Sequence, residues 1–488
     1  MVVKKENLFN NITDVLLVSI SIYFIGILVY IAAYQLGYPY NLEWIEGAMM
    51  DHVHRILGGK SIYCEPSIDF VPSPYTPIYF YLSAFLSLIF GPTIKVMRWI
   101  SAFSTLSILL TLYCWGKRET GSKVAGVISS GMFALVYWFV SEWFFLARVD
   151  MFSLALFAWA AYFVKFGKEN RYLIYAGFLT FLSIFTKQNV LGLALALIVA
   201  GAFVHKKRIG IYFLSWFVPV AVFTVVLNNL TDGRFWYYTM IMPMHHGFVE
   251  TRYLSIFTHD ISIRLLIYVV SAIIFLVVAF RKKEKKDFFF YLFFTGALFV
   301  STYLMRLKVG GATNSYLTFF FGGALFLGFL YGKARSKKGF ILVAAALILI
   351  QSGFLTYDFR RYIPDGLIRR YEHKLVEAMR KMKGDVWLVS SGHLTTLAGK
   401  KYAAHQCLID DSLKNDETRD DFSLRLVSSF RKRKFEYIIV KDADKINPAL
   451  RKDFKKNYEK TDENYKIFKW LGSKKPHFEE VYVYKRKK

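Results

Sequence analysis

Cysteine and proline are scarce in this sequence, and two familiar signatures are missing. Only 3 cysteines and 11 prolines occur among the 488 residues. Cys64, Cys114 and Cys407 lack the spacing of metal ligands, and Cys114 lies inside an apolar run, which leaves a Cys64–Cys407 disulfide as the one pairing to consider. No nucleotide-binding glycine fingerprint and no internal repeat is visible. Neither a dinucleotide-binding domain nor a repeat architecture is therefore indicated.

Acidic residues are few relative to basic ones. The chain has 36 Asp and Glu against 63 Lys and Arg, which gives a formal net charge of +27. Such an excess can indicate nucleic-acid binding. Here, however, many of the cations stand in short clusters between apolar runs, where the orientation of membrane helices explains them. We therefore expect no nucleic-acid partner.

Apolar residues, by contrast, are abundant. They make up 55% of the chain, and the mean hydropathy is +0.33. Apolar runs of roughly 15 to 22 residues recur from Val15 to Thr356, and a bilayer-spanning helix needs about 20. The run from Val15 to Ala33 lacks a small-residue cleavage site, so we expect a retained first helix and not a signal peptide. The composition predicts an all-α polytopic membrane protein.

The apolar runs predict about eleven transmembrane helices. Their expected ranges are 13–34, 97–115, 122–140, 151–166, 172–186, 190–204, 211–229, 262–280, 288–305, 317–332 and 339–357. With the N-terminus in the cytoplasm, every dense basic cluster of this region falls on the cytoplasmic side, as the positive-inside rule expects. The protein should lie in the cytoplasmic (inner) membrane.

One apolar segment does not fit as a crossing. Ile78–Phe90 follows Pro72, Pro74 and Pro77 and has 13 residues, so we expect a re-entrant or interfacial helix in a first outer loop of residues 35–96. A second outer loop covers about residues 141–150.

The composition changes to charged and mixed after the last span. Residues 358–488 are expected to form a small extracytoplasmic α/β domain, which follows a transmembrane domain of residues 1–357. Its expected elements are a helix at 367–383 and strands at 386–389, 435–440 and 481–484.

Two carboxylates follow the first span. Glu43 and Glu46 are three residues apart, so on a helix they would share a face, and a carboxylate at the membrane boundary can act as a base on a hydroxyl. The alternative is an ordinary solvated interfacial helix.

Other polar residues gather in the expected outer loops. Tyr75 lies in a proline-rich segment, although it could equally be an interfacial aromatic residue. Arg148 and Asp150 border the fourth span, as a functional pair or as a structural ion pair. Lys187 stands against the charge bias, where it could meet an anionic headgroup or extend to the interface. Asn314 follows two glycines in the last outer loop.

Taken in chain order, these features resemble the GT-C glycosyltransferases that use polyprenyl-phosphate-linked sugars, which include the protein O-mannosyltransferases (glycosyltransferase family 39) and the aminoarabinose transferases of lipid A. The resemblance covers nearly the whole chain. It rests on the acidic motif, the Gly-Lys-Ser-Ile-Tyr and Tyr-Thr-Pro segments, Arg98, Arg-Val-Asp, Thr-Lys-Gln-Asn, the Gly-Gly-Ala-Thr-Asn-Ser-Tyr loop and Ser391–Gly399. Many relatives have Asp-Glu where this chain has Ile45–Glu46. The base therefore stays open between Glu46, favoured for its match to the family's Glu-Gly pair, and Glu43.

The resemblance implies a GT-C fold and a hexosyl- or pentosyltransferase. It would pass a sugar from a polyprenyl-phosphate donor to a glycan, lipid or protein acceptor on the outer face, with inversion and a carboxylate base. The donor phosphate or sugar would be bound by Arg148, Asp150, Lys187, Asn314, Tyr316 and Tyr75. No cofactor is expected: some GT-C enzymes need a divalent metal, but no metal ligand set is seen here. The absent nucleotide fingerprint agrees with a lipid-linked donor.

A transporter or flippase for lipid-linked saccharides is the alternative. Transporters place ionisable groups near the bilayer midplane and often have repeated halves. In this chain the charges gather in outer loops and no repeat is visible, so we expect a transferase.

Overall fold

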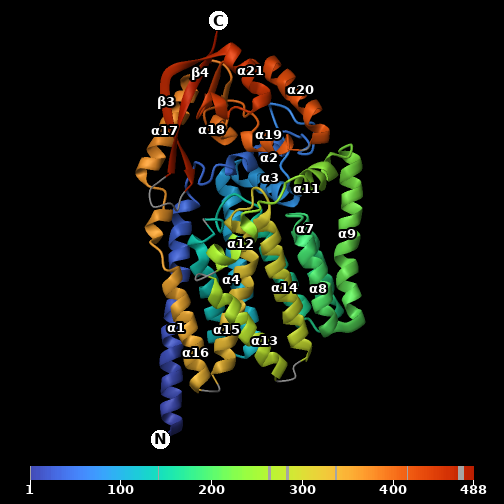
Figure 1. Ribbon diagram of the computed structural model, residues 1–488, viewed down its shortest axis with the longest axis vertical. Helices are drawn as coiled ribbons and strands as arrows, with labels where there is room; N and C mark the ends of the chain where they lie inside the picture. Colours follow the sequence, from blue (N-terminus) through green and yellow to red (C-terminus); the bar gives the residue numbers. More distant parts are fainter. Residues whose placement is uncertain are drawn as a thin grey trace.

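A computed structural model of the chain describes residues 2–140, 142–261, 265–281, 285–335, 338–414, 416–470 and 477–487. Long helices run side by side along the long axis of the molecule, and a small domain with a β-sheet caps one end (Figure 1). The N-terminus lies at the opposite end. The first outer loop and the outer domain therefore share one end of the helix bundle.

The long helices of the bundle are α1 (Val2–Gln35), α4 (Ile94–Thr120), α5 (Lys123–Ala134), α6 (Asp150–Phe166), α7 (Asn170–Ile184), α8 (Val190–His205), α9 (Ile209–Leu230), α13 (Leu266–Arg281), α14 (Lys285–Leu307), α15 (Leu317–Ala334) and α16 (Lys338–Leu355). Shorter elements at the outer end are α2 (Glu46–Leu57), α3 (Ile78–Phe90), η1 (Leu135–Trp138), α10 (Arg234–Trp236), η3 (Tyr237–Ile241), α11 (Met242–Met244), α12 (Arg252–Ser255), η4 (Ile256–Ile261) and η5 (Thr313–Tyr316). The turn η2 (Lys206–Arg208) joins α8 to α9.

These helices match the predicted spans one for one. The predicted fold class, an all-α membrane protein with a small α/β domain, is confirmed. By length and composition, five helical stretches of the described residues are long and apolar enough to cross a bilayer, or up to seven if each of two bent pairs is one span. Several other helices, such as α6 with 17 residues and α7 with 15, fall just short of that length. The count of eleven crossings therefore stays a prediction.

Small residues let neighbouring helices approach closely. A Cβ atom added to Gly131 on α5 would lie 2.3 Å from the Cβ of Ser21 on α1. Likewise, a Cβ on Gly116 of α4 would lie 2.9 Å from the Cα of Gly126 on α5. Because lipid tails are as apolar as leucine, close packing of this kind is the main attraction between membrane helices. It fixes α1, α4 and α5 as one unit that carries the outer loops.

The helix α3 has the range predicted from the sequence. Its 13 residues would rise only about 20 Å, less than the hydrocarbon core of a bilayer. One face is buried, and the other exposes large apolar residues, among them Phe85, Leu88 and Phe90. The start of the helix is fixed to the end of α7, since the Ile78 amide donates to the Phe185 carbonyl at 2.9 Å. This arrangement is typical of an interfacial helix.

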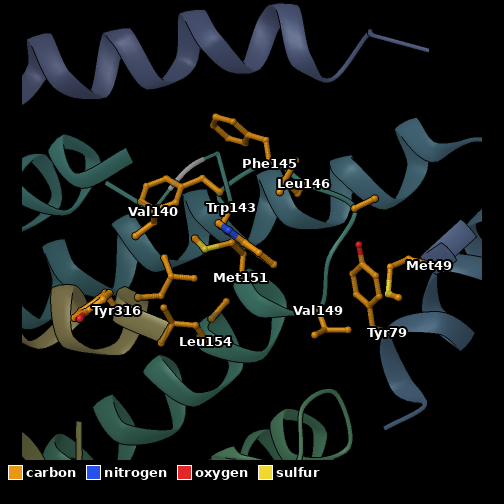
Figure 2. Packing of buried hydrophobic residues seen from close by; sticks show 14 of the residues in the cluster. Met49, Tyr79, Val140, Trp143, Phe145, Leu146, Val149, Met151, Leu154 and Tyr316 are labelled. Atoms are coloured by element: carbon orange, nitrogen blue, oxygen red, sulfur yellow. The ribbon is translucent and has the colours of Figure 1, made fainter. Parts of the chain in front are cut away.

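The loop between η1 and α6 is buried, in contrast to most surface loops. Val140, Phe145, Leu146 and Val149 pack inside the molecule, and Figure 2 shows them with Met151 and Trp143 in one apolar cluster. Such packing holds the polar residues of the same loop in fixed positions.

The outer domain contains a four-stranded sheet with the strand order β1-β2-β4-β3. The strands are β1 (Val386–Leu388), β2 (Tyr437–Val440), β3 (Tyr458–Trp470) and β4 (His477–Arg486), and only the β1–β2 pair is parallel. The helical elements of this part are η6 (Phe359–Tyr362), α17 (Gly366–Lys381), α18 (Gly392–Leu397), α19 (Gln406–Ser412), α20 (Asp416–Arg433), η7 (Ala443–Lys445) and α21 (Pro448–Asn457).

The outer domain is bound to the first outer loop by buried polar contacts. Asn41 Nδ2 donates to Ser391 Oγ at 2.9 Å, and the Ala404 amide donates to the Ile68 carbonyl at 2.8 Å. All three cysteines are unpaired, so Cys64 and Cys407 form no disulfide in this structure.

Candidate active site

Polar residues from five segments meet at the outer end of the bundle. They come from the loop after α1, the proline-rich segment before α3, the loop before α6, the turn between α7 and α8, and η5. Seven of the eight predicted site residues take part in two separate sets of polar contacts. The eighth, Tyr316, has different partners.

Glu46 is held by Arg98 in a buried ion pair. Arg98, on α4, donates from Nε and Nη2 to the two carboxylate oxygens of Glu46 at 3.0 and 2.7 Å. The backbone amides of Ala147 and Leu42 donate to the same carboxylate at 2.7 and 2.6 Å. Burial raises the pKa of Glu46, but Arg98 and the amides outweigh it and hold the pKa below its usual range. Both carboxylate oxygens are thus engaged, and both side chains are fully buried.

Arg98 also fixes the path of the chain after α1. Its guanidinium donates to the carbonyls of Gln35, Tyr38 and Tyr40 at 3.2, 2.7 and 2.6 Å. The pair of Glu46 and Arg98 therefore ties together α1, α2, α4 and the loop before α6. The sequence analysis noted Arg98 only as part of the resemblance, because its partner stands 52 positions earlier in the chain.

Glu43 has a different environment. One oxygen, Oε2, accepts from the Ile45 amide at 3.1 Å and from Arg148 Nη1 at 3.3 Å. Its other oxygen accepts no hydrogen bond from the described residues. Burial raises the pKa of Glu43 to about 7, against the pull of Arg148 and with a small contribution from Glu46. Of the two carboxylates, Glu43 is therefore the better suited to take up a proton near neutral pH.

Arg148 connects Glu43 to Tyr75. Its Nη2 donates to the Tyr75 hydroxyl at 3.3 Å, and its guanidinium lies 4.6 Å from the centre of the Trp143 ring. The Nε group is buried and has no partner among the described residues. Arg148 thus keeps a donor free for an anion.

Asp150, Lys187 and Asn314 form the second set of contacts. Asp150 Oδ1 accepts from Lys187 Nζ at 2.6 Å and from Asn314 Nδ2 at 2.8 Å. Its Oδ2 is buried without a partner among the described residues. The three side chains line a small cavity between α6, α8, α14 and α15, with apolar walls that include Leu154 and Leu193. The cavity has a volume of about 30 Å³, room for about one water molecule, so Lys187 and Asn314 close around Asp150 and not around a larger ligand.

Tyr316 does not join either set. Its hydroxyl donates to Asp260 Oδ2 at 2.6 Å, and the same oxygen accepts from Arg306 Nε at 3.2 Å. The ring packs against Phe139 and Phe320. The structure therefore places Tyr316 as a packed residue that shares the acceptor Asp260 with Arg306 of α14.

Glu142 is a site residue that the sequence analysis missed. It is buried, its Oε1 has no partner among the described residues, and its φ is +69°, in the left-handed region. That conformation costs a non-glycine residue about 1–2 kcal/mol. Burial raises the pKa of Glu142 well above its usual value, with further contributions from Glu43 and Glu46. The signal in the sequence was a single acid in a loop of aromatic residues.

Metal binding has no support in the geometry of the described residues. No group of three or more His, Cys, Asp or Glu side chains in the part of the chain that the structure describes could hold a metal ion.

Comparison with known proteins gives a family profile and several solved structures that are similar to this chain. The profile of the family described as dolichyl-phosphate-mannose-protein mannosyltransferase matches residues 73–231. The crystal structure of ArnT from Cupriavidus metallidurans bound to undecaprenyl phosphate superposes with a TM-score of 0.60 at 10% identity, over 95% of this chain and 97% of that one. The chain therefore shares the fold of ArnT over nearly its whole length.

The apo form of the same ArnT gives a TM-score of 0.58 at 11% identity, over 95% of this chain and 97% of that one. Archaeal oligosaccharyltransferase AglB from Archaeoglobus fulgidus, in complex with an inhibitory peptide and a dolichol-phosphate, gives a TM-score of 0.47 at 12% identity, over 86% of this chain and 69% of that one. A search of curated protein sequences gave no significant match.

The part of the chain that matches the family profile does not contain the whole site. Residues 73–231 include Tyr75, Arg148, Asp150 and Lys187, whereas Glu43 precedes them. The site therefore combines residues from inside and outside the matched segment, which folding brings together.

Proposed function

We propose that this protein is a GT-C glycosyltransferase that transfers a sugar from a polyprenyl-phosphate donor to an acceptor hydroxyl on the outer side of the cytoplasmic membrane, and that Glu43 is the base. The observation that carries the assignment of the base is the contrast between the two carboxylates. Glu43 has a free oxygen and a pKa of about 7, while both oxygens of Glu46 are taken up by Arg98 and backbone amides. Glu46 is thus a positioning residue.

The reaction is a single displacement. The acceptor oxygen attacks the anomeric carbon while Glu43 takes its proton, and the bond from that carbon to the phosphate oxygen breaks. The sugar is inverted, and the polyprenyl phosphate leaves with the electron pair. The free Nε of Arg148 and the ammonium of Lys187 stabilise the charge that develops on the phosphate, and Asn314 supports Lys187 through Asp150.

Two observations support a polyprenyl-phosphate donor. Arg148 and Lys187 place two cations at the outer end of the bundle, and the ArnT structure with a similar fold is bound to undecaprenyl phosphate. The proposed orientation has the N-terminus in the cytoplasm and the outer domain outside, because the basic clusters then lie on the cytoplasmic side.

The test is transfer of labelled sugar from polyprenyl-phosphate donors in membranes that contain the protein. Glu43→Gln should lower the rate by about 100-fold or more, since a positioned base contributes roughly 10²–10⁴. Arg148→Ala should also lower the rate. Consumption of the donor by Glu43→Gln at the wild-type rate would exclude Glu43 as the base. If wild type moves lipid-linked sugar across the membrane without consuming it, transport is the function.

A further inference from the structure

A second cavity lies between the first outer loop and the outer domain. It has a volume of about 350 Å³, within the range of sites for small molecules. Trp44, Asn41 and His405 form the wall nearest the membrane, and Gln406, Lys445 and Glu479 are among the residues of the outer domain that line it. None of these residues belongs to the two sets of contacts described above.

One residue of the cavity wall, Trp44, is the sequence neighbour of the proposed base. Trp44 follows Glu43 directly in the chain. His405 Nδ1 accepts from the Cys407 amide at 3.1 Å, which leaves Nε2 to donate to the Trp44 carbonyl at 3.2 Å. The ring of Trp44 lies 5.2 Å from that of His405, measured between centroids. The wall of the cavity is therefore fastened to the segment that carries Glu43.

Two amide oxygens in the wall lack hydrogen-bond donors. Asn41 Nδ2 donates to Ser391 Oγ at 2.9 Å and Gln406 Nε2 donates to the Lys445 carbonyl at 2.5 Å, so both side chains are fixed. Yet Asn41 Oδ1 and Gln406 Oε1 are buried and accept nothing from the described residues. Buried acceptors are normally paired, so these two oxygens call for donors from outside the chain.

The rim of the cavity carries charges of both signs, and its wall holds one partly exposed aromatic ring. Lys441 and Glu479 form an ion pair at 2.7 Å on the rim, and Asp410 accepts from Asn447 at 2.7 Å. Hydrogen-bond donors and acceptors surround the half-buried indole of Trp44. Such a site suits a ligand that has many hydroxyl groups and also C–H faces that can pack on the ring. The strands β2 and β4, which supply Val440 and Val481 to the wall, are paired with each other and offer no free edge to an added peptide strand, whereas Ile467 comes from the edge strand β3.

We propose that this cavity is a saccharide-binding site that presents the hydroxyl of a glycan acceptor to Glu43. The acceptor part of this proposal rests on the proposed function. The saccharide lies with one ring against Trp44, and its hydroxyls donate to Asn41 Oδ1 and Gln406 Oε1. The acceptor is thereby specified as a glycan and not as a protein.

The test measures binding to the full-length protein in detergent, by saturation-transfer NMR and calorimetry. The probes are glucose, galactose, N-acetylglucosamine and maltose, with a serine-containing tripeptide for comparison. We expect at least one saccharide to bind, and Trp44→Ala and Gln406→Ala each to weaken it by 10-fold or more. Trp44→Phe, which keeps an aromatic ring and preserves folding, should have a saccharide affinity between those of wild type and Trp44→Ala. Trp99→Ala is the control, because Trp99 lies on α4 with 48% of its surface exposed, far in sequence from the cavity.

The outcomes separate this proposal from the proposed function. Binding of the tripeptide alone, of no saccharide, or of a saccharide with unchanged affinity in both cavity variants would overturn the saccharide site. If a saccharide binds through Trp44 and Gln406 but wild type consumes no donor, the site is supported and the transferase function fails. If donor is consumed and the cavity variants raise the KM for the saccharide acceptor, both proposals are supported.

Discussion

At the scale of single residues, the site depends on which hydrogen bonds and ion pairs two nearby carboxylates make. Glu43 and Glu46 are three positions apart, and both are buried. The sequence analysis favoured Glu46 because of its match to a family motif. The partner that makes Glu46 a structural residue, Arg98, lies on another helix, and its approach depends on the packing of the bundle. Sequence spacing alone could therefore not separate the two roles.

The pH dependence of transfer should reflect Glu43. Burial raises its pKa to about 7, and only the ionised form accepts a proton. The rate should therefore rise with pH up to about 7 and level off above it. The measurement is the initial rate of donor consumption from about pH 5.5 to 8.5. A base with an ordinary carboxylate pKa would give a flat profile over this range, which would contradict the assignment.

Loss of the Glu46 carboxylate should destabilise the protein. Glu46→Gln leaves Arg98 buried without its counter-charge, and such a change costs roughly 3–5 kcal/mol. The thermal midpoint of the purified protein in detergent should fall clearly. Glu169→Gln is the matched control, because it breaks an exposed Glu–Arg pair worth at most about 1 kcal/mol. Equal midpoints for the two variants would mean that the buried pair is not an anchor.

At the scale of elements, the sequence predicted most of the structure. All eleven expected spans and the interfacial segment at residues 78–90 are helices, because long apolar runs specify helices in a membrane. Three of the four strands were also expected, with β2 two residues and β1 one residue shorter. The strand β3 was missed. Its sequence, Tyr-Glu-Lys-Thr-Asp-Glu-Asn-Tyr, is rich in residues that disfavour strands, and it is held by pairing with β4.

The contact of α1 with α5 should be sensitive to side-chain size. Gly131→Ala places a Cβ atom 2.3 Å from Ser21, so the helices must separate, and overpacking of this kind costs about 1–3 kcal/mol. Gly26→Ala on α1 is the control, since no atom lies within 4 Å of its added Cβ. Thermal unfolding in detergent compares the two. A midpoint for Gly131→Ala at or above that of Gly26→Ala would show that this contact is loose.

At the scale of the whole molecule, orientation in the membrane decides on which side the sugar is transferred. In a cysteine-free background, Lys456→Cys in the outer domain should react with an impermeant maleimide in intact cells. Lys168→Cys, between α6 and α7, should react only after permeabilisation. Both lysines are exposed, so access to the reagent is the only difference. The reverse pattern would place the site on the cytoplasmic face.

The contacts that join the outer domain to the bundle connect residues that are synthesised at very different times. Tyr38 donates to Glu372 at 2.9 Å, Asn41 to Ser391 at 2.9 Å, and His405 binds the Trp44 carbonyl. In each pair one residue leaves the ribosome more than 300 positions after the other. The segment that carries Glu43 is therefore synthesised long before the residues of the outer domain that contact it. The proposed site is therefore complete only after the outer domain has been translated and has docked on this segment.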